Sequence, residues 1–466
     1  MTIPALVLRV MGLTILALGA SEALLADDSA FEQQAISLLT QYLRIDTTNP
    51  PGNEIEAAEF FKAIFDREGI EAQIFESAPG RGNVYARLRG DGSKKALVLL
   101  NHMDVVPAYR QLWSVDPFAG IVKDGYLWGR GSLDMKSMGI VELMAMLALK
   151  RQGIPLKADV IFLGVADEEA GGAMGAGFML KEHFDLLQNA GTVLNEGGAI
   201  YAAEDGKAQR YDVETTQKTP FWLLLTVTGK PGHGSAPRAD SAVTRLIEAL
   251  HRIVKYQTPL KVEPIVQQFY ADVAELDPSP EKRESLKDLR KSLQNPAFAA
   301  EFTRNPYANA RIRNTISITM LEGSNKVNVI PALASAQLDV RLLPSQDQQQ
   351  FLAELRAIIA DDSIKIEPVL SFAPSSSPTD AEFLYVLREV VNTAHPGVKI
   401  VTPLSTGFTD CHYFRERNIP CYGFTPFKRT DKDAEGIHGH DERISLENIK
   451  FGTRVMYEIV RRMAAH

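Results

Sequence analysis

The chain has 466 residues, of which 45% are hydrophobic and 23% are charged, and its formal net charge is −8. This length accommodates two domains, and the composition is that of a soluble globular protein. The charged residues form neither a long acidic run nor a basic patch. A negative chain without a basic patch is not expected to bind nucleic acid, so that class of partner is excluded.

Residues 1–26 have the layout of a secretory signal peptide. Arg9 precedes the apolar stretch MGLTILALGA, and small residues follow at suitable cleavage positions, after Ala23 or Ala26. The apolar stretch is too short for a comfortable membrane span, and no other segment approaches that length. We therefore expect export to the periplasm or the medium without a stable membrane partner. The alternative is an uncleaved N-terminal membrane anchor.

Residues 27–212 alternate between helix-like and strand-like segments. Two helical patterns, FEQQAISLLTQYLRI and EIEAAEFFKAIFDREG, are separated by the turn-rich TTNPPGN. The strand-like segments are ALVLL (96–100), VIFLGVA (160–166) and TVLNEGG (192–198), with helical patterns between them. Alternation at about 30 residues per unit predicts an α/β domain with a mostly parallel sheet and flanking helices.

The pattern changes near residue 213. Up to residue 371 the segments follow the order strand–helix–strand–strand–helix–strand, which predicts a small ferredoxin-like α+β domain with two helices on one face of its sheet. A polar helical stretch at about 265–310 interrupts this order, and we interpret it as a surface insertion. The α/β pattern resumes over 372–466. We therefore expect one α/β domain that is interrupted by a smaller one.

Polar side chains follow the predicted strands of the α/β domain. His102 comes after ALVLL, Glu169 after VIFLGVA and Glu196 after TVLN, while Asp134 lies in the glycine-rich GRGSLDMK. Ligands bind at the carboxyl ends of the strands in open α/β sheets, so we expect these four side chains to converge on one rim. Taken singly, each is equally compatible with an ordinary surface histidine or a helix-capping acid.

Several carboxylates on one rim repel one another unless a cation compensates them. Imidazole and carboxylate ligands without a thiolate suit Zn²⁺, with Mn²⁺ or Co²⁺ as alternatives. The number of acids suggests two ions that share a carboxylate. His438 and His440, in EGIHGHDERI, are further candidate ligands, and His233, in GKPGHGSAPRAD, is a weaker one.

Two cysteines, Cys411 and Cys421, are ten residues apart. Their spacing matches no metal-binding motif. They either form a disulfide in an oxidising compartment or remain two buried thiols.

Six motifs in order resemble those of the M20 family of metallopeptidases: NHMDVVPA, GRGSLDMKSM, ADEEAGG, NEGG, GHGSAP and IHGHDE. That family includes glutamate carboxypeptidases, aminoacylases and carboxypeptidase S-like enzymes. The resemblance covers most of the chain after the signal peptide. It implies a zinc-exopeptidase-like α/β domain, an inserted lid or dimerisation domain, and a homodimer that could form through this inserted domain.

The resemblance also implies a metal centre. Two divalent ions, with Zn²⁺ as the expected metal, would be bound by five residues, namely His102, Asp134, Glu169, Glu196 and His438. Asp134 would bridge both ions, and His440 is the alternative to His438. Asp104 would orient the imidazole of His102 from behind.

Other matching positions imply catalytic and substrate-binding roles. Glu168 would be the general base. His233 would stabilise the oxyanion, either in its own chain or in that of a dimer partner. Asn328 and Arg341 would contact the substrate or support the lid.

Three features depart from the family pattern. Met135 follows the bridging acid where the family often has a second acid at a cis peptide, Ser137 stands where glycine is common, and SFAPSSSP lacks an arginine. These departures leave the metal ligands intact and favour the carboxypeptidase S and N-acyl-amino-acid branch.

We therefore expect a hydrolase that cleaves an amide or peptide bond next to a free carboxylate. Its substrates would be dipeptides, C-terminal residues or N-acyl amino acids. A phosphoesterase is disfavoured because no glycine-rich phosphate loop is present. A non-catalytic binding protein is disfavoured because the ligands and the base are all retained.

Overall fold

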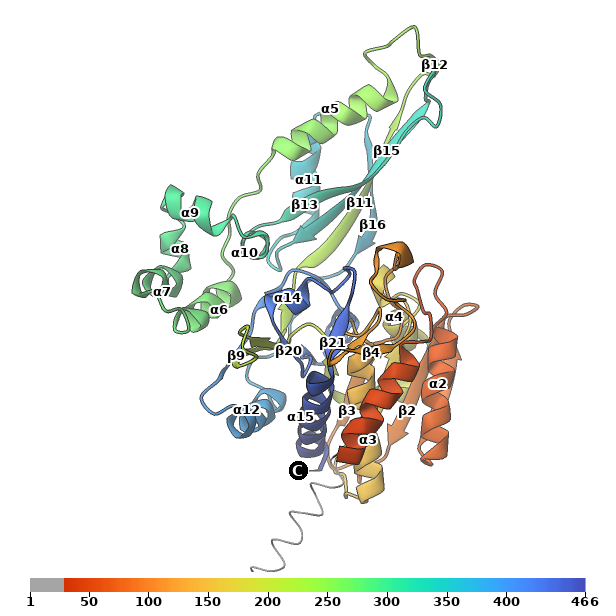
Figure 1. The fold of residues 1–466 in the computed structure, drawn as a ribbon. Coiled ribbons are helices and arrows are strands. Elements are labelled where there is room, and N and C mark those ends of the chain that lie inside the picture. The colour runs from red at the N-terminus through yellow and green to blue at the C-terminus, as the bar shows by residue number, and fades with distance from the viewer. Residues whose placement is uncertain (1–28, 466) are drawn as a thin grey trace, which may run out of the picture.

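The computed structural model describes residues 29–465 (Figure 1). The expected signal peptide, residues 1–26, lies outside the described residues. Among the described helices, none combines the length and apolar character that crossing a membrane requires. Below we call residues 219–371 the lid and the remaining described residues the main domain.

A six-stranded mixed sheet forms the centre of the main domain. Its strand order is β1 (Glu71–Glu76), β2 (Gly82–Leu88), β6 (Val160–Val165), β3 (Ala96–His102), β7 (Ala190–Asn195) and β19 (Cys421–Gly423). The last four strands are parallel, and β1 and β2 are antiparallel additions at one edge. Every residue of β3 and β6 is buried, as expected for continuous apolar strands covered on both faces.

Helices cover both faces of this sheet. One layer contains residues 29–42, α2 (Glu54–Arg67), α3 (Lys136–Gln152), α12 (Glu382–Ala394) and α15 (Leu446–Ala465). The other contains α4 (Ala176–Glu182) and α13 (Cys411–Arg415). Strand β3 serves both cores by alternation: Leu97 and Leu99 belong to the first, whereas Val98 and Leu100 belong to the second.

Short strands extend the main domain beside the rim of the central sheet. A three-stranded sheet has the order β21 (Arg443–Ser445), β5 (Tyr126–Trp128) and β4 (Ile121–Lys123). A four-stranded sheet has the order β17 (Lys399–Val401), β9 (Ala208–Asp212), β8 (Ile200–Ala202) and β20 (Lys428–Arg429). The pair β10 (Thr216–Gln217) and β18 (Leu404–Ser405) lies where the chain enters the lid.

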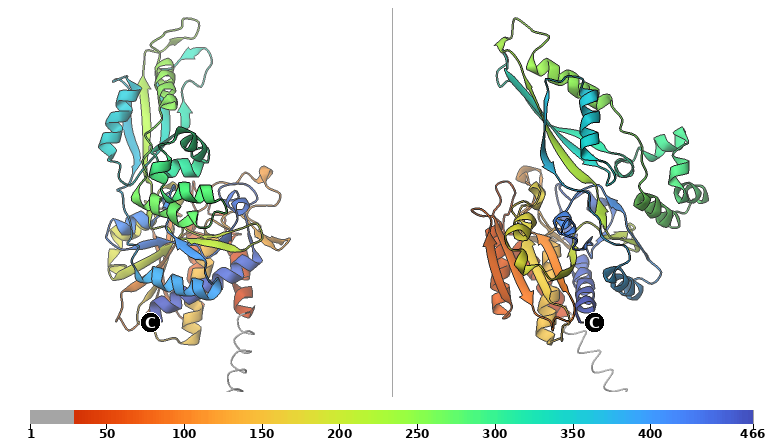
Figure 2. Two further views of the ribbon diagram at one scale, coloured as in Figure 1. Left: turned by 90° about the vertical axis from the view of Figure 1, so that its left-hand side faces the viewer. Right: turned by 180° about the vertical axis from the view of Figure 1, so that it is seen from behind.

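The lid is a four-stranded antiparallel sheet with two helices on one face (Figure 2). The strand order is β13 (Thr315–Glu322), β15 (Leu333–Leu342), β11 (Thr219–Thr228) and β16 (Lys365–Ser371), and the helices are α5 (Ala242–Lys255) and α11 (Gln348–Ile359). Alternate residues of β11 and β15 are buried against these helices in a core separate from that of the main domain. The predicted fold class, an α/β domain interrupted by a ferredoxin-like one, is confirmed.

The helical stretch inside the lid sequence has a core of its own. It consists of α6 (Pro264–Ala274), α7 (Pro280–Lys287), α8 (Leu289–Ser292), α9 (Pro296–Phe302) and α10 (Pro306–Arg311). Four of these helices have proline in the first turn, where its missing N–H costs nothing. Its apolar cluster also includes Val401 and Leu404 of the main domain, so the insertion packs against that domain instead of only covering the lid surface.

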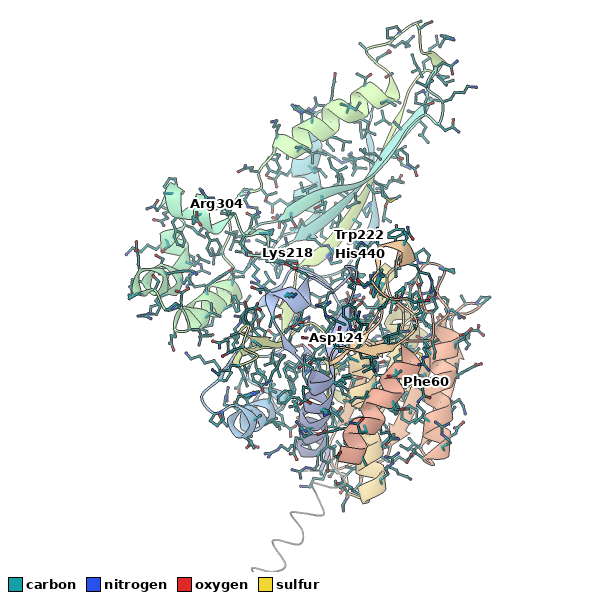
Figure 3. All side chains as sticks on the ribbon, viewed as in Figure 1. Phe60, Asp124, Lys218, Trp222, Arg304 and His440 are labelled. Carbon is teal, nitrogen blue, oxygen red and sulfur yellow. A yellow bond between two sulfur atoms is a disulfide. The ribbon has the colours of Figure 1, made fainter. Side chains whose placement is uncertain are left out.

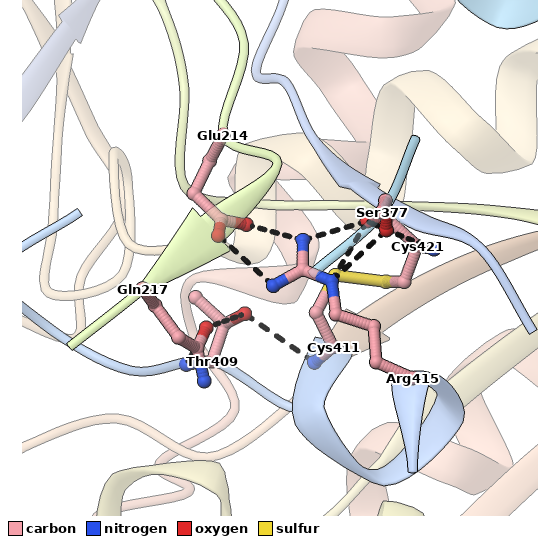
Figure 4. Close-up of a disulfide and its surroundings, with 7 residues drawn as sticks. All are labelled: Glu214, Gln217, Ser377, Thr409, Cys411, Arg415 and Cys421. Atoms are coloured by element: carbon pink, nitrogen blue, oxygen red, sulfur yellow. Dashed lines mark hydrogen bonds and ion pairs between the residues drawn. A yellow bond between two sulfur atoms is a disulfide. The ribbon is translucent and has the colours of Figure 1, made fainter. Parts of the chain in front are cut away.

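A buried ion pair and a disulfide hold the main domain together beside the entry to the lid (Figure 4). Arg415 donates to both carboxylate oxygens of Glu214, at 3.0 and 2.9 Å, and to the main-chain oxygen of Cys421 at 2.6 Å. Cys411 and Cys421 form a disulfide with a Cα–Cα distance of 5.3 Å, which decides between the two alternatives left open by the sequence.

Replacing Arg415 with methionine should strongly destabilise the protein. Glu214 would be left buried without its partner, and breaking one half of a buried pair costs about 3–5 kcal/mol of unfolding free energy. Urea unfolding followed by circular dichroism measures this loss. Glu301→Gln, which removes the exposed ion pair with Arg304, is the control and should change stability by less than about 1 kcal/mol. Equal, small effects of both variants would contradict the structural role of the buried pair.

Candidate metal centre

Two triads of potential metal ligands share the carboxylate of Asp134. His102 Nε2 lies 3.2 Å from Asp134 Oδ1 and 3.5 Å from Glu196 Oε1. His438 Nε2 lies 3.2 Å from Asp134 Oδ2 and 3.2 Å from Glu169 Oε2. Within each triad the ligand atoms all lie within 4.8 Å of one another. The fold thus brings together all five residues that the sequence singled out as ligands.

These ligands come from separate parts of the rim. His102 is the last residue of β3, and Glu196 follows directly after β7. Glu169 belongs to the short 3₁₀ turn η2 (Glu168–Ala170), which follows β6. Asp134 precedes α3 and is joined to Met135 by a cis peptide bond, although Met135 is not an acid. Convergence at the carboxyl edge of the parallel strands is therefore what places the centre.

Of the two histidines in the C-terminal loop, His438 is the one in contact with the acids. Its backbone has a positive φ of 57°, and its imidazole reaches both Asp134 and Glu169. Hydrogen bonds with these two carboxylates raise the pKa of His438 to about 10. His440 is exposed, belongs to neither triad and lies at the junction with the lid (Figure 3).

The charges of this cluster fit divalent cations. Burial, reinforced by the charge of Asp134, raises the pKa of Glu196 to about 8 and also raises that of Glu169. Glu169 Oε1 is buried without a hydrogen-bond partner among the described residues. Buried carboxylates that repel one another and lack donors are stabilised by metal ions, and imidazole plus carboxylate is a donor set that Zn²⁺ accepts.

Glu168 lies beside the triads on the same turn as Glu169. It is buried, and burial together with the charge of Glu196 raises its pKa well above the usual carboxyl range. Asp104 holds this turn in place because its carboxylate accepts the backbone N–H groups of Glu168 at 3.1 Å and Glu169 at 3.2 Å. The position of Glu168 is therefore fixed by the hydrogen bond of its backbone N–H and not by the charge of its own carboxylate.

Asp104 also contacts the first ligand, but mainly through its main chain. His102 Nδ1 lies 3.0 Å from the main-chain oxygen of Asp104 and 3.5 Å from its carboxylate Oδ1. The resemblance implied orientation of the imidazole by the side chain of Asp104. In the structure the carbonyl is the nearer acceptor, and the carboxylate both contacts the imidazole and accepts N–H groups from the turn of Glu168.

Asp167, the first of the three adjacent acids in ADEEAGG, pairs with an arginine that the sequence did not indicate. Arg81 donates to Asp167 Oδ1 at 2.9 Å and to Glu54 Oε1 at 2.8 Å. Asp167 has a left-handed backbone, φ 74°, and also accepts the N–H of Met174 at 3.0 Å. Arg81 lies far from any motif and before an antiparallel strand, so no sequence signal connected it with the site.

Glu442 is a second residue that sequence reasoning missed. Its buried carboxylate accepts the backbone N–H groups of Gly131, Leu133 and Asp134 at 3.0, 2.6 and 3.1 Å, and Arg130 pairs with it at 2.6 Å. Glu442, which belongs to the same loop as His438, thus holds the turn that positions Asp134, the ligand shared by both triads. The only sequence signal was its place within IHGHDE.

Asp410, at the start of α13, is a further buried acid at this rim. Burial raises its pKa, and its charge acts on both Glu168 and Glu196. A Cβ atom on Gly172 would lie 2.2 Å from Asp410 Oδ1, and Gly172 also has φ +71°. Glycine is therefore required at this position by both space and backbone conformation.

The lid residues His233 and Asn328 lie away from the metal centre of their own chain. β12 (Gly232–His233) pairs with β14 (Val329–Ile330) at the tip of the lid, far from the main domain in Figure 1. The His233 imidazole forms its side-chain hydrogen bonds within the described chain with Ser235, and the main-chain oxygen of Asn328 accepts the N–H of Gly234. Neither side chain contacts the site in cis, so the cis alternative for His233 is not met in this structure.

Arg341 lies at the opposite end of the lid, at its base. Its guanidinium pairs with Asp339 at 2.6 Å and lies over the rings of Phe408 and Trp222, 4.9 and 5.7 Å from their centroids. Trp222 is labelled at the junction of lid and main domain in Figure 3. Arg341 therefore supports the base of the lid.

Replacing Glu442 with glutamine should weaken Zn²⁺ binding by about 10–100-fold, the range found when a residue that orients metal ligands is lost. The amide cannot accept the three N–H groups and the guanidinium as the carboxylate does, so the turn of Asp134 would lose its geometry. Competition with a chromogenic chelator measures the Zn²⁺ affinity. Glu435→Gln, an exposed acid of the same loop, is the control. Unchanged affinity in Glu442→Gln would contradict this role.

Comparison with known proteins agrees with the geometry. The family model described as peptidase family M20/M25/M40 matches residues 98–462. N-fatty-acyl-amino acid synthase/hydrolase PM20D1 of Mus musculus is 30% identical over 458 residues, covering 92% of this chain and 87% of its own. Aminoacylase-1 of Sus scrofa is 28% identical over 445 residues, covering 93% of this chain and 96% of its own.

A solved structure shares the fold. The M20 family metallo-carboxypeptidase Sso-CP2 of Sulfolobus solfataricus superposes with a TM-score of 0.70 at 18% identity, covering 92% of this chain and 98% of that one. The match of the family model extends over most of the chain and includes every ligand of the two triads. This chain therefore belongs to peptidase family M20/M25/M40 and is a metal-dependent amidohydrolase.

Proposed function

We propose that this protein hydrolyses the amide bond of N-acyl amino acids with the help of two divalent metal ions, Zn²⁺ in the first place. The observation that carries this proposal is the pair of ligand triads sharing Asp134, with Glu168 buried beside them on the turn of Glu169. Such an arrangement combines two metal positions with one carboxylate that binds neither, as a general base requires.

The residues of the metal centre would have separate roles in amide hydrolysis. When bound, the ions act as Lewis acids that lower the pKa of water and polarise a carbonyl group. His102, Asp134 and Glu196 would hold one ion, and Asp134, Glu169 and His438 the other. Glu168 would accept a proton from the attacking water and return it to the leaving amine. Asp104 keeps Glu168 in place through its backbone N–H.

The choice of an N-acyl amino acid over a dipeptide rests on the relatives. The curated relatives that cover nine-tenths of this chain are named N-fatty-acyl-amino acid synthase/hydrolase and aminoacylase-1. The segment SFAPSSSP also lacks the arginine of the carboxypeptidase branch. A dipeptidase or carboxypeptidase is the second candidate, since the fold is shared with an M20 metallo-carboxypeptidase.

Turnover of a substrate panel tests this proposal. Zn²⁺-loaded protein should hydrolyse N-acetyl-leucine or N-dodecanoyl-leucine faster than the dipeptide Leu-Leu, and a chelator should abolish the activity. Glu168→Gln should lose at least about 100-fold in kcat while two ions stay bound, because only the base is removed. Glu169→Ala should lose metal as well.

Three outcomes would contradict parts of this proposal. Hydrolysis of dipeptides alone would favour the second candidate. Activity that survives complete metal removal would refute the metal-dependent mechanism. Equal metal loss in Glu168→Gln and Glu169→Ala would refute the separation of base and ligand, and elemental analysis of both variants decides this point.

We also propose a homodimer formed through the lid. Large apolar side chains are exposed on the outer face of the lid, namely Ile247, Val254, Leu321, Val327 and Val329. They line one groove between α5 and the loop 323–331. Monomeric proteins rarely expose contiguous apolar surface of this kind, and a second copy would cover it. His233 lies at the tip of the same lid and would serve the partner's metal centre.

Subunit mixing tests whether His233 acts in trans. His233→Ala and Glu168→Gln homodimers should each be nearly inactive. A heterodimer of the two contains one site with both wild-type residues if His233 is supplied by the partner, and mixed, refolded protein should then recover about a quarter of wild-type activity. If His233 acts in cis, neither site of the heterodimer is complete and mixing restores nothing. Light scattering of the wild type checks the dimer itself.

A further inference from the structure

One face of the lid sheet is left uncovered by the helices of the lid. Helices α5 and α11 lie together on the opposite face, as Figure 2 shows. Leu223 and Leu225 of β11 are buried against these helices. Because side chains alternate along a strand, Trp222, Leu224 and Thr226 lie on the uncovered face, which is called the open face below.

The open face carries large apolar side chains where polar ones are expected on an uncovered antiparallel sheet. Trp222 and Leu224 are half-buried, whereas Met320 of β13 and Leu333 of β15 are 48% and 52% exposed. Leu224 and Met320 are both register partners of Gln337, so they share its face. Leu333 precedes Gln337 by four positions on the same strand and therefore also lies there.

This apolar surface begins at the turn of the metal centre. Leu370 of β16 is the register partner of Trp222 and lies on the open face as well. A Cβ atom on Gly171 would lie 3.1 Å from Leu370 Cδ1, and Gly171 directly follows the turn Glu168–Ala170. The ring of Trp222 is 6.1 Å from that of Phe408, at the junction of lid and main domain (Figure 3). We call Leu370, Trp222, Leu224, Met320 and Leu333 the apolar strip.

Beyond Leu224 the apolar strip widens into a hollow of about 240 Å³. The lining includes Leu224, Thr226, Met320, Leu333 and Ser335 and, as a charged residue, Glu322. The carboxylate of Glu322 repels an anion, so the part of a ligand that enters this hollow is expected to be uncharged.

The length of the apolar strip selects the kind of ligand. Leu333 is opposite Thr228, six residues beyond Trp222 on β11, and at about 3.3 Å per residue the strip extends over about 20 Å. This length exceeds the reach of an amino-acid side chain. A long hydrocarbon chain that is attached to the carbonyl at the metal centre can follow it.

We propose that the apolar strip binds a long, unbranched acyl chain of the substrate, with the end of the chain in the hollow. This inference rests on the proposed function, because it names the class of acyl group that the N-acyl amino acid carries. Each methylene transferred from water to apolar surface contributes up to about fourfold in affinity. The strip would therefore act in specificity and not in the chemical step.

The dependence of turnover on chain length tests the apolar strip. For Zn²⁺-loaded wild type we expect kcat/KM for N-dodecanoyl-leucine to exceed that for N-acetyl-leucine at least about 100-fold. Leu224→Gln and Leu333→Gln should each lower this ratio at least about fivefold. Leu333 is exposed, so its replacement does not endanger folding. Leu260→Gln, an equally polar change at a 38% exposed leucine outside the strip, is the control and should leave the ratio unchanged.

Fluorescence quenching locates the acyl chain without any turnover. Zn²⁺-loaded Glu168→Gln protein is titrated with N-(6-bromohexanoyl)-leucine and with unbrominated N-hexanoyl-leucine. Bromine quenches the fluorescence of a tryptophan that it contacts, and Trp222 is the tryptophan of the apolar strip. We expect quenching by the brominated ligand alone and its loss in the Trp222→Phe variant.

Two results would overturn the inference. The first is an unchanged chain-length ratio in both leucine variants, and if light scattering then shows that Leu333→Gln breaks a dimer, a second copy covers the open face instead. The second is quenching that persists in Trp222→Phe, because the chain would then contact another tryptophan. Failure of the proposed function shows itself differently, since the wild type would then hydrolyse neither N-acetyl-leucine nor N-dodecanoyl-leucine.

Discussion

Repulsion between buried carboxylates at the carboxyl edge of the central sheet is the constraint on which the site depends. Asp134, Glu168, Glu169 and Glu196 are held close together by three separate segments of the chain, and burial raises the pKa of three of them. The pKa of Asp134, the acid shared by both triads, is lowered instead, because hydrogen bonds with His102 and His438 outweigh the effect of burial. Divalent cations bound by these ligands would relieve this repulsion.

The surrounding structure holds this unfavourable cluster by fixing its backbone. The carboxylate of Asp104 accepts an N–H group from the turn of Glu168, and the carboxylate of Glu442 accepts N–H groups from the turn of Asp134. These hydrogen bonds hold both turns in place. Arg81 forms ion pairs with Asp167 and Glu54 and thereby offsets part of the negative charge beside the cluster. The disulfide beside Arg415 is of the kind that forms in oxidising compartments, and the export expected from residues 1–26 stays a prediction.

The lid connects the main domain to a tip that lies far from the metal centre of its own chain. Its base is packed on the main domain through Arg341 and Phe408, whereas its tip carries His233 far from the centre of its own chain. An oxyanion role for His233 therefore requires either a partner or a large movement of the lid.

The sequence by itself determined the fold class, the ligand types and the rim where they meet. The reason is that apolar strands ending in His102, Glu169 and Glu196 must place these residues at one edge of a parallel sheet. Tertiary structure decided what sequence spacing does not encode. It brought His438 and not His440 into contact with Asp134 and Glu169, formed the disulfide, and brought Arg81 and Glu442 to turns distant in sequence.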